Sequence, residues 1–155
     1  MKRYYLAYGS NLNIEEMKKR CPFAIPVGAS AIKDYRLVYK GTKIVSYLTI
    51  EPCEGSIVPV GVYEITPMDE FNLDYYECVP TLYSKNMITV SLYGQDIQAI
   101  VYIMNPTYSY HLPSESYVSR CLQGYQNFHF NLFSQMRTEN PFSLAIFFLR
   151  PIPPI

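Results

Sequence analysis

A short stretch near the N-terminus combines residue types that can bind an anion or a carbonyl oxygen. An apolar run leads directly into Gly-Ser-Asn in the segment Tyr4-Tyr5-Leu6-Ala7-Tyr8-Gly9-Ser10-Asn11-Leu12. This order predicts a buried strand, a tight turn and a helix start, where backbone N–H groups without helical partners can converge on a ligand. Gly9 allows close approach to the backbone, and we expect Ser10 or Asn11 to cap the helix that follows. A plain strand, turn and helix with no ligand is the alternative that this stretch alone leaves open.

The second candidate is a carboxylate at the expected end of a later helix. Glu77 lies in the segment Leu73-Asp74-Tyr75-Tyr76-Glu77-Cys78-Val79-Pro80, and Tyr83 follows shortly after. A single carboxylate can act first as a base and then as an acid if it lies beside both reacting groups. A negative charge at a helix C-terminus is electrostatically unfavourable, which indicates a functional reason for this position. A structural glutamate at a helix end is the alternative.

Together, the two segments resemble the gamma-glutamylcyclotransferase family, also called the AIG2-like group. The family pattern is an N-terminal YGSN strand and turn, followed by LDxxEG and then a tyrosine. Three further segments match in the same order, at residues 47–52, 60–65 and 113–117. The similarity covers roughly residues 3 to 135, and one position departs from it, because the family usually has glycine where this chain has Cys78.

The resemblance implies an enzyme that catalyses an intramolecular aminolysis. The free α-amine of a γ-glutamyl group attacks its own γ-carbonyl, closes the lactam 5-oxoproline, and expels an amine or amino acid. In this reaction Glu77 takes a proton from the α-ammonium and protonates the leaving nitrogen, and desolvation should raise its pKa. The chemistry needs no metal or organic cofactor. The resemblance implies a substrate-binding set made of Tyr5, Leu6, Ala7, Tyr8, Gly9, Ser10, Asn11, Tyr83 and Tyr117.

A non-catalytic binding protein that keeps the γ-glutamyl pocket is the competing hypothesis. Cys78 at the glycine position favours it, although the sequence places no histidine or basic residue beside this thiol to activate it as a nucleophile. Ser10 is not part of a GxSxG elbow, so a serine-hydrolase site is not indicated. The sequence does not identify the leaving amine, because that half of the pocket depends on loops at residues 106–113 and around Cys53.

Composition excludes several other classes of function. The 155 residues carry 13 basic and 13 acidic side chains, so neither nucleic acid nor an anionic membrane is an expected partner. No apolar run is long enough to span a membrane. The four cysteines are widely spaced and only two histidines accompany them, so no zinc site is predicted. No signal peptide is recognised before the first strand, and we therefore expect a cytoplasmic protein with free thiols.

The pattern of apolar residues and turn formers predicts alternating strands and short helices. Strands are expected at residues 4–8, 27–31, 34–39, 44–50, 59–65, 85–93 and 98–104. Helices are expected at residues 13–20, 66–76 with Thr66 as cap and Pro67 in the first turn, 114–122, and near 131–137. Turns are expected near Lys33 and at residues 94–96, loops at 51–56 and 106–113, and a helix end at Gly124.

These elements predict an α+β fold with a strongly curved mixed sheet. The resemblance sharpens this to a small mixed β-barrel flanked by a few α-helices, with the YGSN turn and Glu77 at one mouth. The domain should span residues 1–138, and residues 139–155 form a proline-rich apolar tail. Because an exposed apolar tail favours aggregation, we expect it to be buried, as an edge strand, a swapped arm or a homodimer contact. A segment with no role in the family is the alternative.

Overall fold

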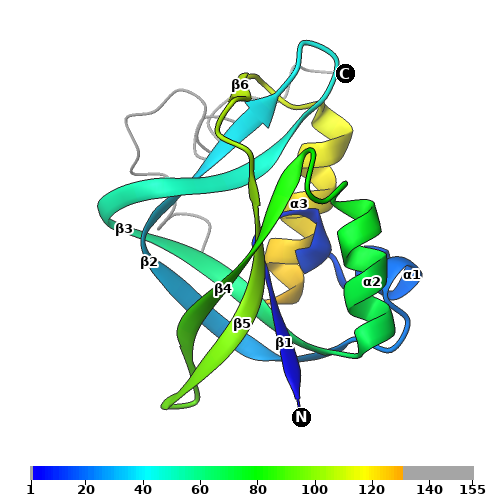
Figure 1. Cartoon of the computed structure of the whole chain (residues 1–155), viewed down its shortest axis with the longest axis vertical. Helices are drawn as coiled ribbons and strands as arrows, with labels where there is room; N and C mark the ends of the chain where they lie inside the picture. Colours follow the sequence, from blue (N-terminus) through cyan, green and yellow to red (C-terminus); the bar gives the residue numbers. More distant parts are fainter. Residues whose placement is uncertain (1, 131–155) are drawn as a thin grey trace.

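A six-stranded mixed sheet forms the centre of the molecule, with the strand order β4-β5-β1-β3-β2-β6. The computed structural model describes residues 2–130, and in Figure 1 the sheet curls into a half-barrel with the helices gathered at one side. The predicted α+β fold with a curved mixed sheet is therefore confirmed. The predicted helix near residues 131–137 and the tail at 139–155 lie outside the described residues.

The three α-helices begin within one residue of their predicted starts, whereas β2, β3, β4 and β5 are longer than the strands predicted for them. The strands are β1 (Arg3–Ala7), β2 (Ile25–Gly41), β3 (Ser46–Ile65), β4 (Tyr83–Leu92), β5 (Gln95–Met104) and β6 (Ser109–Tyr110). The helices are the 3-10 turn η1 (Ser10–Leu12) and the α-helices α1 (Ile14–Arg20), α2 (Pro67–Tyr76) and α3 (Glu115–Asn127).

The long hairpin of β2 and β3 corrects two predictions. Residues 27–31 and 34–39 belong to one strand, and the turn predicted near Lys33 is instead a register shift at Asp34, whose φ is 61°. Residues 51–56 are not a loop between strands but part of β3 opposite this shift, where the Gly55 N–H donates to Asp34 Oδ1 at 2.9 Å. The turn formers here bend a continuous hairpin, so that it curls around the core instead of ending.

β1 lies in the middle of the sheet and carries the N-terminal segment toward the site. It pairs antiparallel with β3 from Arg3↔Ile65 to Ala7↔Gly61, and parallel with β5 at Tyr5↔Ile100. β4 and β5 form the predicted hairpin, but the turn predicted at residues 94–96 lies instead at Tyr93 and Gly94, which both have positive φ as a type I′ turn requires, and residues 95–96 already belong to β5. The curl brings this hairpin to β2, where Ser30 Oγ donates to the Ser91 carbonyl at 2.5 Å.

Two predictions about helix ends are wrong. Asn13, rather than Ser10 or Asn11, caps α1, because its side chain accepts the Glu16 N–H and leaves the two earlier residues in η1. Gly124 does not end α3, which continues to Asn127. A Cβ atom at Gly124 would lie 2.5 Å from the Asn13 nitrogen, so the glycine lets α3 pack directly against the end of η1.

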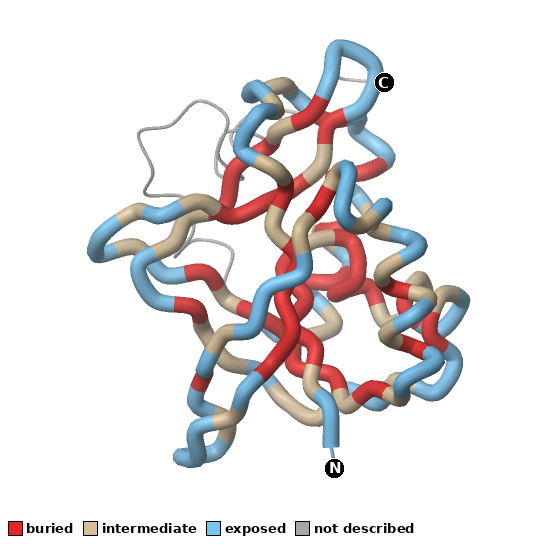
Figure 2. Tube along the Cα trace, in the orientation of Figure 1, coloured by how far each residue is buried: buried red, intermediate tan, exposed pale blue. Residues whose placement is uncertain are grey.

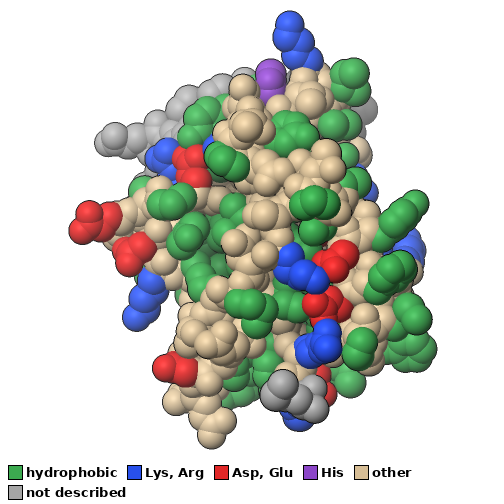
Figure 3. All heavy atoms as spheres, in the orientation of Figure 1, with side chains coloured by type: hydrophobic (Ala, Val, Ile, Leu, Met, Phe, Trp, Pro, Cys, Tyr) green, Lys and Arg blue, Asp and Glu red, His purple; other side chains and the backbone are tan. Residues whose placement is uncertain are grey.

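The core follows the middle of the curled sheet and the inner faces of the helices. Figure 2 shows buried residues along the second half of β1, at both ends of β3 and in the second half of β5, whereas the middle of β3 and the hairpin tips are more exposed. On the face seen in Figure 3, acidic and basic side chains lie close to one another among apolar and neutral side chains. Among residues 2–130, no helix has the length and apolar character needed to cross a bilayer, and all four cysteines are free.

Candidate active site

Helix α2 begins where its sequence predicts. The Thr66 hydroxyl accepts the Asp69 N–H at 3.2 Å, and Asp69 Oδ2 accepts the Thr66 N–H at 2.9 Å, which completes a capping box. Pro67 occupies the first turn, where no N–H partner is needed. With its start fixed, the helix reaches Tyr76, and Glu77 becomes its C-terminal cap.

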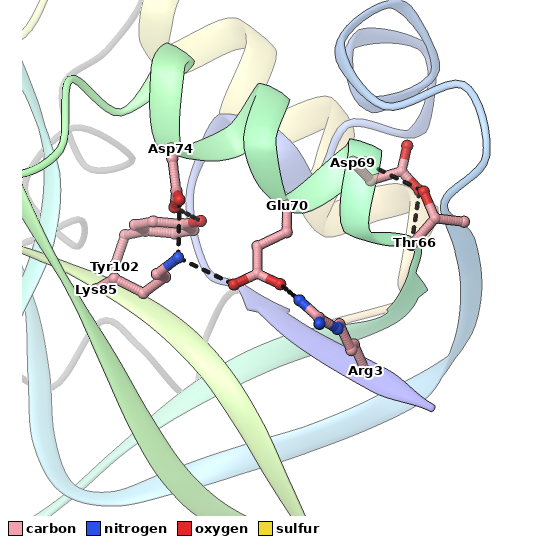
Figure 4. Close-up of polar contacts among 7 residues, drawn as sticks. All are labelled: Arg3, Thr66, Asp69, Glu70, Asp74, Lys85 and Tyr102. Carbon is pink, nitrogen blue, oxygen red and sulfur yellow. Dashed lines mark hydrogen bonds and ion pairs between the residues drawn. The ribbon is translucent and has the colours of Figure 1, made fainter. Parts of the chain in front are cut away.

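A network of charged groups ties α2 to three strands (Figure 4). The Glu70 carboxylate pairs with Arg3 of β1 and accepts a hydrogen bond from Lys85 Nζ of β4 at 2.9 Å. Lys85 also donates to Asp74 Oδ2 at 2.7 Å, and the Tyr102 hydroxyl of β5 donates to Asp74 Oδ1 at 2.7 Å. The last turn of α2 is therefore held against the sheet immediately before Glu77.

The residues around Glu77 divide between the core, the surface and a pocket. Leu73 is fully buried, Tyr75 is 84% exposed, and Tyr76, Glu77 and Cys78 line a pocket. The backbone turns sharply at this point, because Cys78 has a φ of 51° in the left-handed region. This turn ends the helix immediately after Glu77, whose side chain lines the pocket.

The opposite wall of the pocket comes from the end of β1 and from η1. The N–H groups of Leu12 and Asn13 bond to the Gly9 and Ser10 carbonyls, both at 3.0 Å, so the chain turns tightly behind β1. A Cβ atom at Gly9 would lie 3.3 Å from the Tyr117 hydroxyl and 3.5 Å from Leu48 Cβ. Glycine thus allows the turn to lie against two other elements of the pocket wall.

The pocket has a volume of about 150 Å³ and brings together residues from most elements of the fold. It is lined by Tyr5, Tyr8, Gly9, Ser10, Asn11, Tyr47, Leu48, Tyr76, Glu77, Cys78, Leu82, Tyr83, Tyr102 and Tyr117. Eight of the ten residues predicted for the site are in this set. Leu6 and Ala7 are fully buried in the core instead, so their role in substrate binding stays a prediction. Within residues 2–130, no group of three or more acidic, histidine or cysteine side chains is arranged to hold a metal.

Glu77 is the one charged side chain among the described residues of this lining. Burial of the carboxyl group raises its pKa to about 7, and the opposing effect of the Arg20 charge is smaller. Its Oε1 atom lies 3.4 Å from Asn11 Nδ2, which also donates to the Tyr5 hydroxyl at 2.9 Å. A carboxyl group with this pKa exchanges protons readily near neutral pH, as a general acid or base must.

Four buried tyrosines fix the remaining walls through their hydroxyl groups. The Tyr83 hydroxyl donates to the Leu48 carbonyl at 2.7 Å, and the Tyr117 oxygen accepts the Leu48 N–H at 3.0 Å. The Tyr8 hydroxyl donates to the Tyr102 carbonyl at 2.5 Å, and the Tyr102 hydroxyl donates to Asp74. These bonds hold the aromatic rings in place, so the pocket is shaped before any ligand binds.

Comparison with known families gives a match over most of the chain. The family described as "Gamma-glutamyl cyclotransferase, AIG2-like" matches residues 5–119. The chain belongs to this family. The match includes both the turn after β1 and the end of α2, which form two opposite walls of the pocket. A comparison with the sequences of curated proteins gives no significant match.

Solved structures of the family's fold superimpose well on this one. A structure named gamma-glutamyl cyclotransferase has a TM-score of 0.79 at 24% identity, over 87% of this chain and 85% of the other. An uncharacterised human protein gives 0.78 at 24% identity, over 86% and 84%. An AIG2-like mouse protein gives 0.56 at 22% identity, over 74% and 89%. At these identities the similarity establishes a shared fold.

Sequence reasoning missed several residues of the family's pocket in this chain. Tyr47, Leu48, Leu82 and Tyr102 line it but follow no short motif. Tyr47 and Leu48 lie in a segment that matches the family, which was a signal that residues 47–52 approach the site. Tyr102 gives no signal in the sequence, because its place depends on the parallel pairing of β1 with β5.

Proposed function

We propose that this chain is a γ-glutamyl cyclotransferase that releases 5-oxoproline from a γ-glutamyl compound by intramolecular aminolysis. The observation that carries the proposal is a carboxyl group with a pKa of about 7, in a pocket opposite a tight turn. Membership in the AIG2-like family supports the same reaction class.

The raised pKa of Glu77 suits the first proton transfer. A free α-ammonium has a pKa of about 8, so transfer to a carboxylate of pKa about 4.3 would cost about 5 kcal/mol. Transfer to Glu77, with a pKa of about 7, costs only about 1.4 kcal/mol. The freed amine then attacks the γ-carbonyl, and the protonated Glu77 can deliver the proton to the departing nitrogen.

The turn after β1 supplies the second requirement, which is stabilisation of the developing oxyanion. Gly9, Ser10 and Asn11 line the pocket, and the first N–H groups of a helical turn have no partner within it. Donors of this kind, fixed before the reaction, typically contribute 10²–10³ in rate. The pocket also holds the amine close to its own carbonyl, which lowers the entropic part of the barrier.

The charge of the pocket favours one class of leaving group. Glu77 is the one charged group in the described lining, and the other side chains are mainly tyrosine and leucine. An expelled amino acid carries a carboxylate that finds no cation among these residues. We therefore expect γ-glutamylamines to react faster than γ-glutamyl amino acids.

A non-catalytic binding protein is the second candidate. Cys78 stands at the position where the family usually has glycine, and it lies directly beside the proposed base. In this case the protein would bind γ-glutamyl compounds in the pocket without converting them.

Release of 5-oxoproline separates the two candidates. The purified protein is incubated with γ-glutamylamines, γ-glutamyl dipeptides and glutathione, and 5-oxoproline and ligand affinity are both measured. Turnover of at least one compound supports the enzyme, with the amines fastest. Binding without 5-oxoproline across the whole panel would support the binding protein.

A further inference from the structure

We propose that Arg20, which lies outside the pocket, is a positioning residue that fixes the Asn11 side chain with its amide N–H toward Glu77. The proposal rests on the proposed function in that Glu77 is the base whose position matters. Arg20 belongs to no segment that the sequence singled out for the site. Three lines of geometry support its role.

The first is a continuous chain of hydrogen bonds from α1 into the pocket. Arg20 Nη1 donates to Asn11 Oδ1 at 2.5 Å. On the other side of the amide, Asn11 Nδ2 donates to the Tyr5 hydroxyl at 2.9 Å and lies 3.4 Å from Glu77 Oε1. The Asn11 amide oxygen is therefore bound by the Arg20 cation, and the amide nitrogen is bound by two groups that line the pocket.

The second is that the guanidinium determines which way the amide faces. A guanidinium only donates hydrogen bonds, so the Asn11 group that faces Arg20 must be its oxygen. The nitrogen then faces Glu77 and Tyr5, where it can donate to the carboxylate. Without Arg20, rotation of the amide by half a turn would place its oxygen against the Glu77 carboxylate, where two acceptors repel.

The third is that Arg20 itself is firmly held. Its side chain is 12% exposed and its Nη2 atom pairs with Glu16 at 3.2 Å. The guanidinium carbon lies 3.9 Å from the centre of the Tyr76 ring, which also lines the pocket. The Arg20 carbonyl accepts a hydrogen bond from Asn72 Nδ2 of α2 at 3.0 Å. Arg20 thus joins α1, η1 and the end of α2 around one amide.

The groups that face Glu77 define the expected effect of removing Arg20. They are Tyr5 of β1, Tyr8 just after β1, Tyr47 of β3, Tyr76 and Cys78 at the end of α2, Tyr83 of β4, Tyr102 of β5, and Tyr117 of α3. These groups are neutral in their ordinary protonation state near pH 7. The other charged groups are Glu16 of α1, the ion-pair partner of Arg20, and Arg120 of α3. Burial raises the pKa of Tyr76, and the charge of Arg120 acts together with that of Arg20 to oppose this rise. Arg20 is the cation that lowers the pKa of Glu77, so its loss should raise that pKa further.

The test uses Arg20→Met, Arg20→Lys and the matched control Lys19→Met. Lys19 is next to Arg20, pairs with the same Glu16 and is mostly exposed, but it has no contact with Asn11. NMR titration of the labelled Glu77 carboxyl group in the full chain should show its midpoint raised by on the order of one pH unit in Arg20→Met. We expect Lys19→Met to match wild type, and Arg20→Lys to remain within a few tenths because it keeps the charge.

A double-mutant cycle then tests whether Arg20 acts through Asn11. Arg20→Met alone should lower kcat about tenfold or more, because misplacing a reacting group by a fraction of an ångström is costly. In an Asn11→Ala background the same substitution should change kcat by less than about twofold, when each variant is measured at a pH well above its own Glu77 midpoint so that the charge effect of Arg20 on that midpoint drops out. Equal effects in the two backgrounds, or a Glu77 midpoint that Arg20→Met leaves unchanged, would overturn the proposal.

The test of Arg20 can fail or succeed independently of the test of the proposed function. If wild type releases no 5-oxoproline from any compound, the enzyme proposal fails, but the Glu77 titration still decides whether Arg20 acts on it. If Arg20→Met does not fold, Arg20→Lys carries the test. If Arg20→Lys keeps the wild-type kcat, the planar guanidinium is not needed to orient Asn11, and the proposal fails. If Arg20→Lys loses about tenfold in kcat while the Glu77 midpoint is unchanged, the proposal is supported.

Discussion

The two walls of the pocket differ in burial, charge and backbone conformation. The wall from β1 and η1 is neutral, and most of it is buried in the core. The wall at the end of α2 carries the charge at Glu77, an exposed Cys78 and a backbone in the left-handed region. The comparison teaches that the proposed backbone N–H donors of the turn after β1 lie on the buried part of the fold. Glu77, the proposed acid and base, lies at the end of a helix that ion pairs near the surface hold in place.

The largest expected effect comes from Glu77→Gln. The amide has nearly the size of the carboxylate but cannot take up or deliver a proton near neutral pH. Because one group serves both proton transfers, we expect 5-oxoproline formation to fall by about 10³–10⁴, the upper part of the range for general acid–base catalysis. Ligand affinity serves as the folding control. A variant that keeps more than about a tenth of the wild-type rate would show that Glu77 is not the base.

The second prediction concerns the rigid wall. Gly9→Ala introduces a methyl group 3.3 Å from the Tyr117 hydroxyl, so Tyr117 must move and the turn shifts with it. The rate of 5-oxoproline formation should fall about ten- to a hundredfold.

Gly94→Ala is the matched control for this change. Gly94 has a φ of 78° in the β4–β5 turn, and its Cβ would meet no atom within 4 Å. It should lose about 1 kcal/mol of stability and keep full activity. Equal rates in Gly9→Ala and wild type would show that close packing at the turn does not matter for turnover.

The third prediction is a pH dependence of stability caused by Glu77. Folding raises the pKa of Glu77 to about 7. At any pH between the pKa of Glu77 in the unfolded chain and 7, the folded state therefore holds a proton that the unfolded state has lost. Stability contributed by the protonated group is therefore lost as pH rises through this window. Relative to Glu77→Gln, wild type should become less stable between pH 5 and 8 by on the order of 1–3 kcal/mol. Parallel denaturation curves for the two proteins at all pH values would contradict the raised pKa.

Local signals predicted the helix that carries Glu77, but not the strands that surround it. Thr66, Pro67 and Asp69 define the start of α2 by short-range capping, which the sequence shows directly. The predicted end at Tyr76 agrees with the structure. The continuity of β2 and β3 depends on pairing across a register shift at Asp34, which turn propensities misread as a turn and a loop.

The same distinction applies to the pocket. Glu77 and the turn at Gly9 stand in short motifs that the family resemblance identified. Arg20 and Tyr102 reach the site through contacts between elements distant in sequence, with Asn11 and Asp74 respectively. Residues of this kind have no local pattern, and only the arrangement of the elements reveals them.

The smallest expected effect is that of Cys78→Gly in the charged wall. Cys78 has a φ of 51°, a conformation that costs a residue with a Cβ atom about 1 kcal/mol, whereas glycine adopts it freely. Glycine also gains flexibility in the unfolded state, which offsets part of this benefit. We therefore expect a gain in stability of about 0.5 kcal/mol and activity equal to or above that of wild type.

Cys78→Ala separates the two properties of this residue, because it removes the thiol but keeps the Cβ atom and hence the strain. If strain is the only effect of Cys78, alanine should match wild type in stability and glycine should exceed both, as measured by chemical denaturation. A loss of more than about tenfold in 5-oxoproline formation in both variants, with the fold intact, would instead assign the thiol beside Glu77 a role in the reaction.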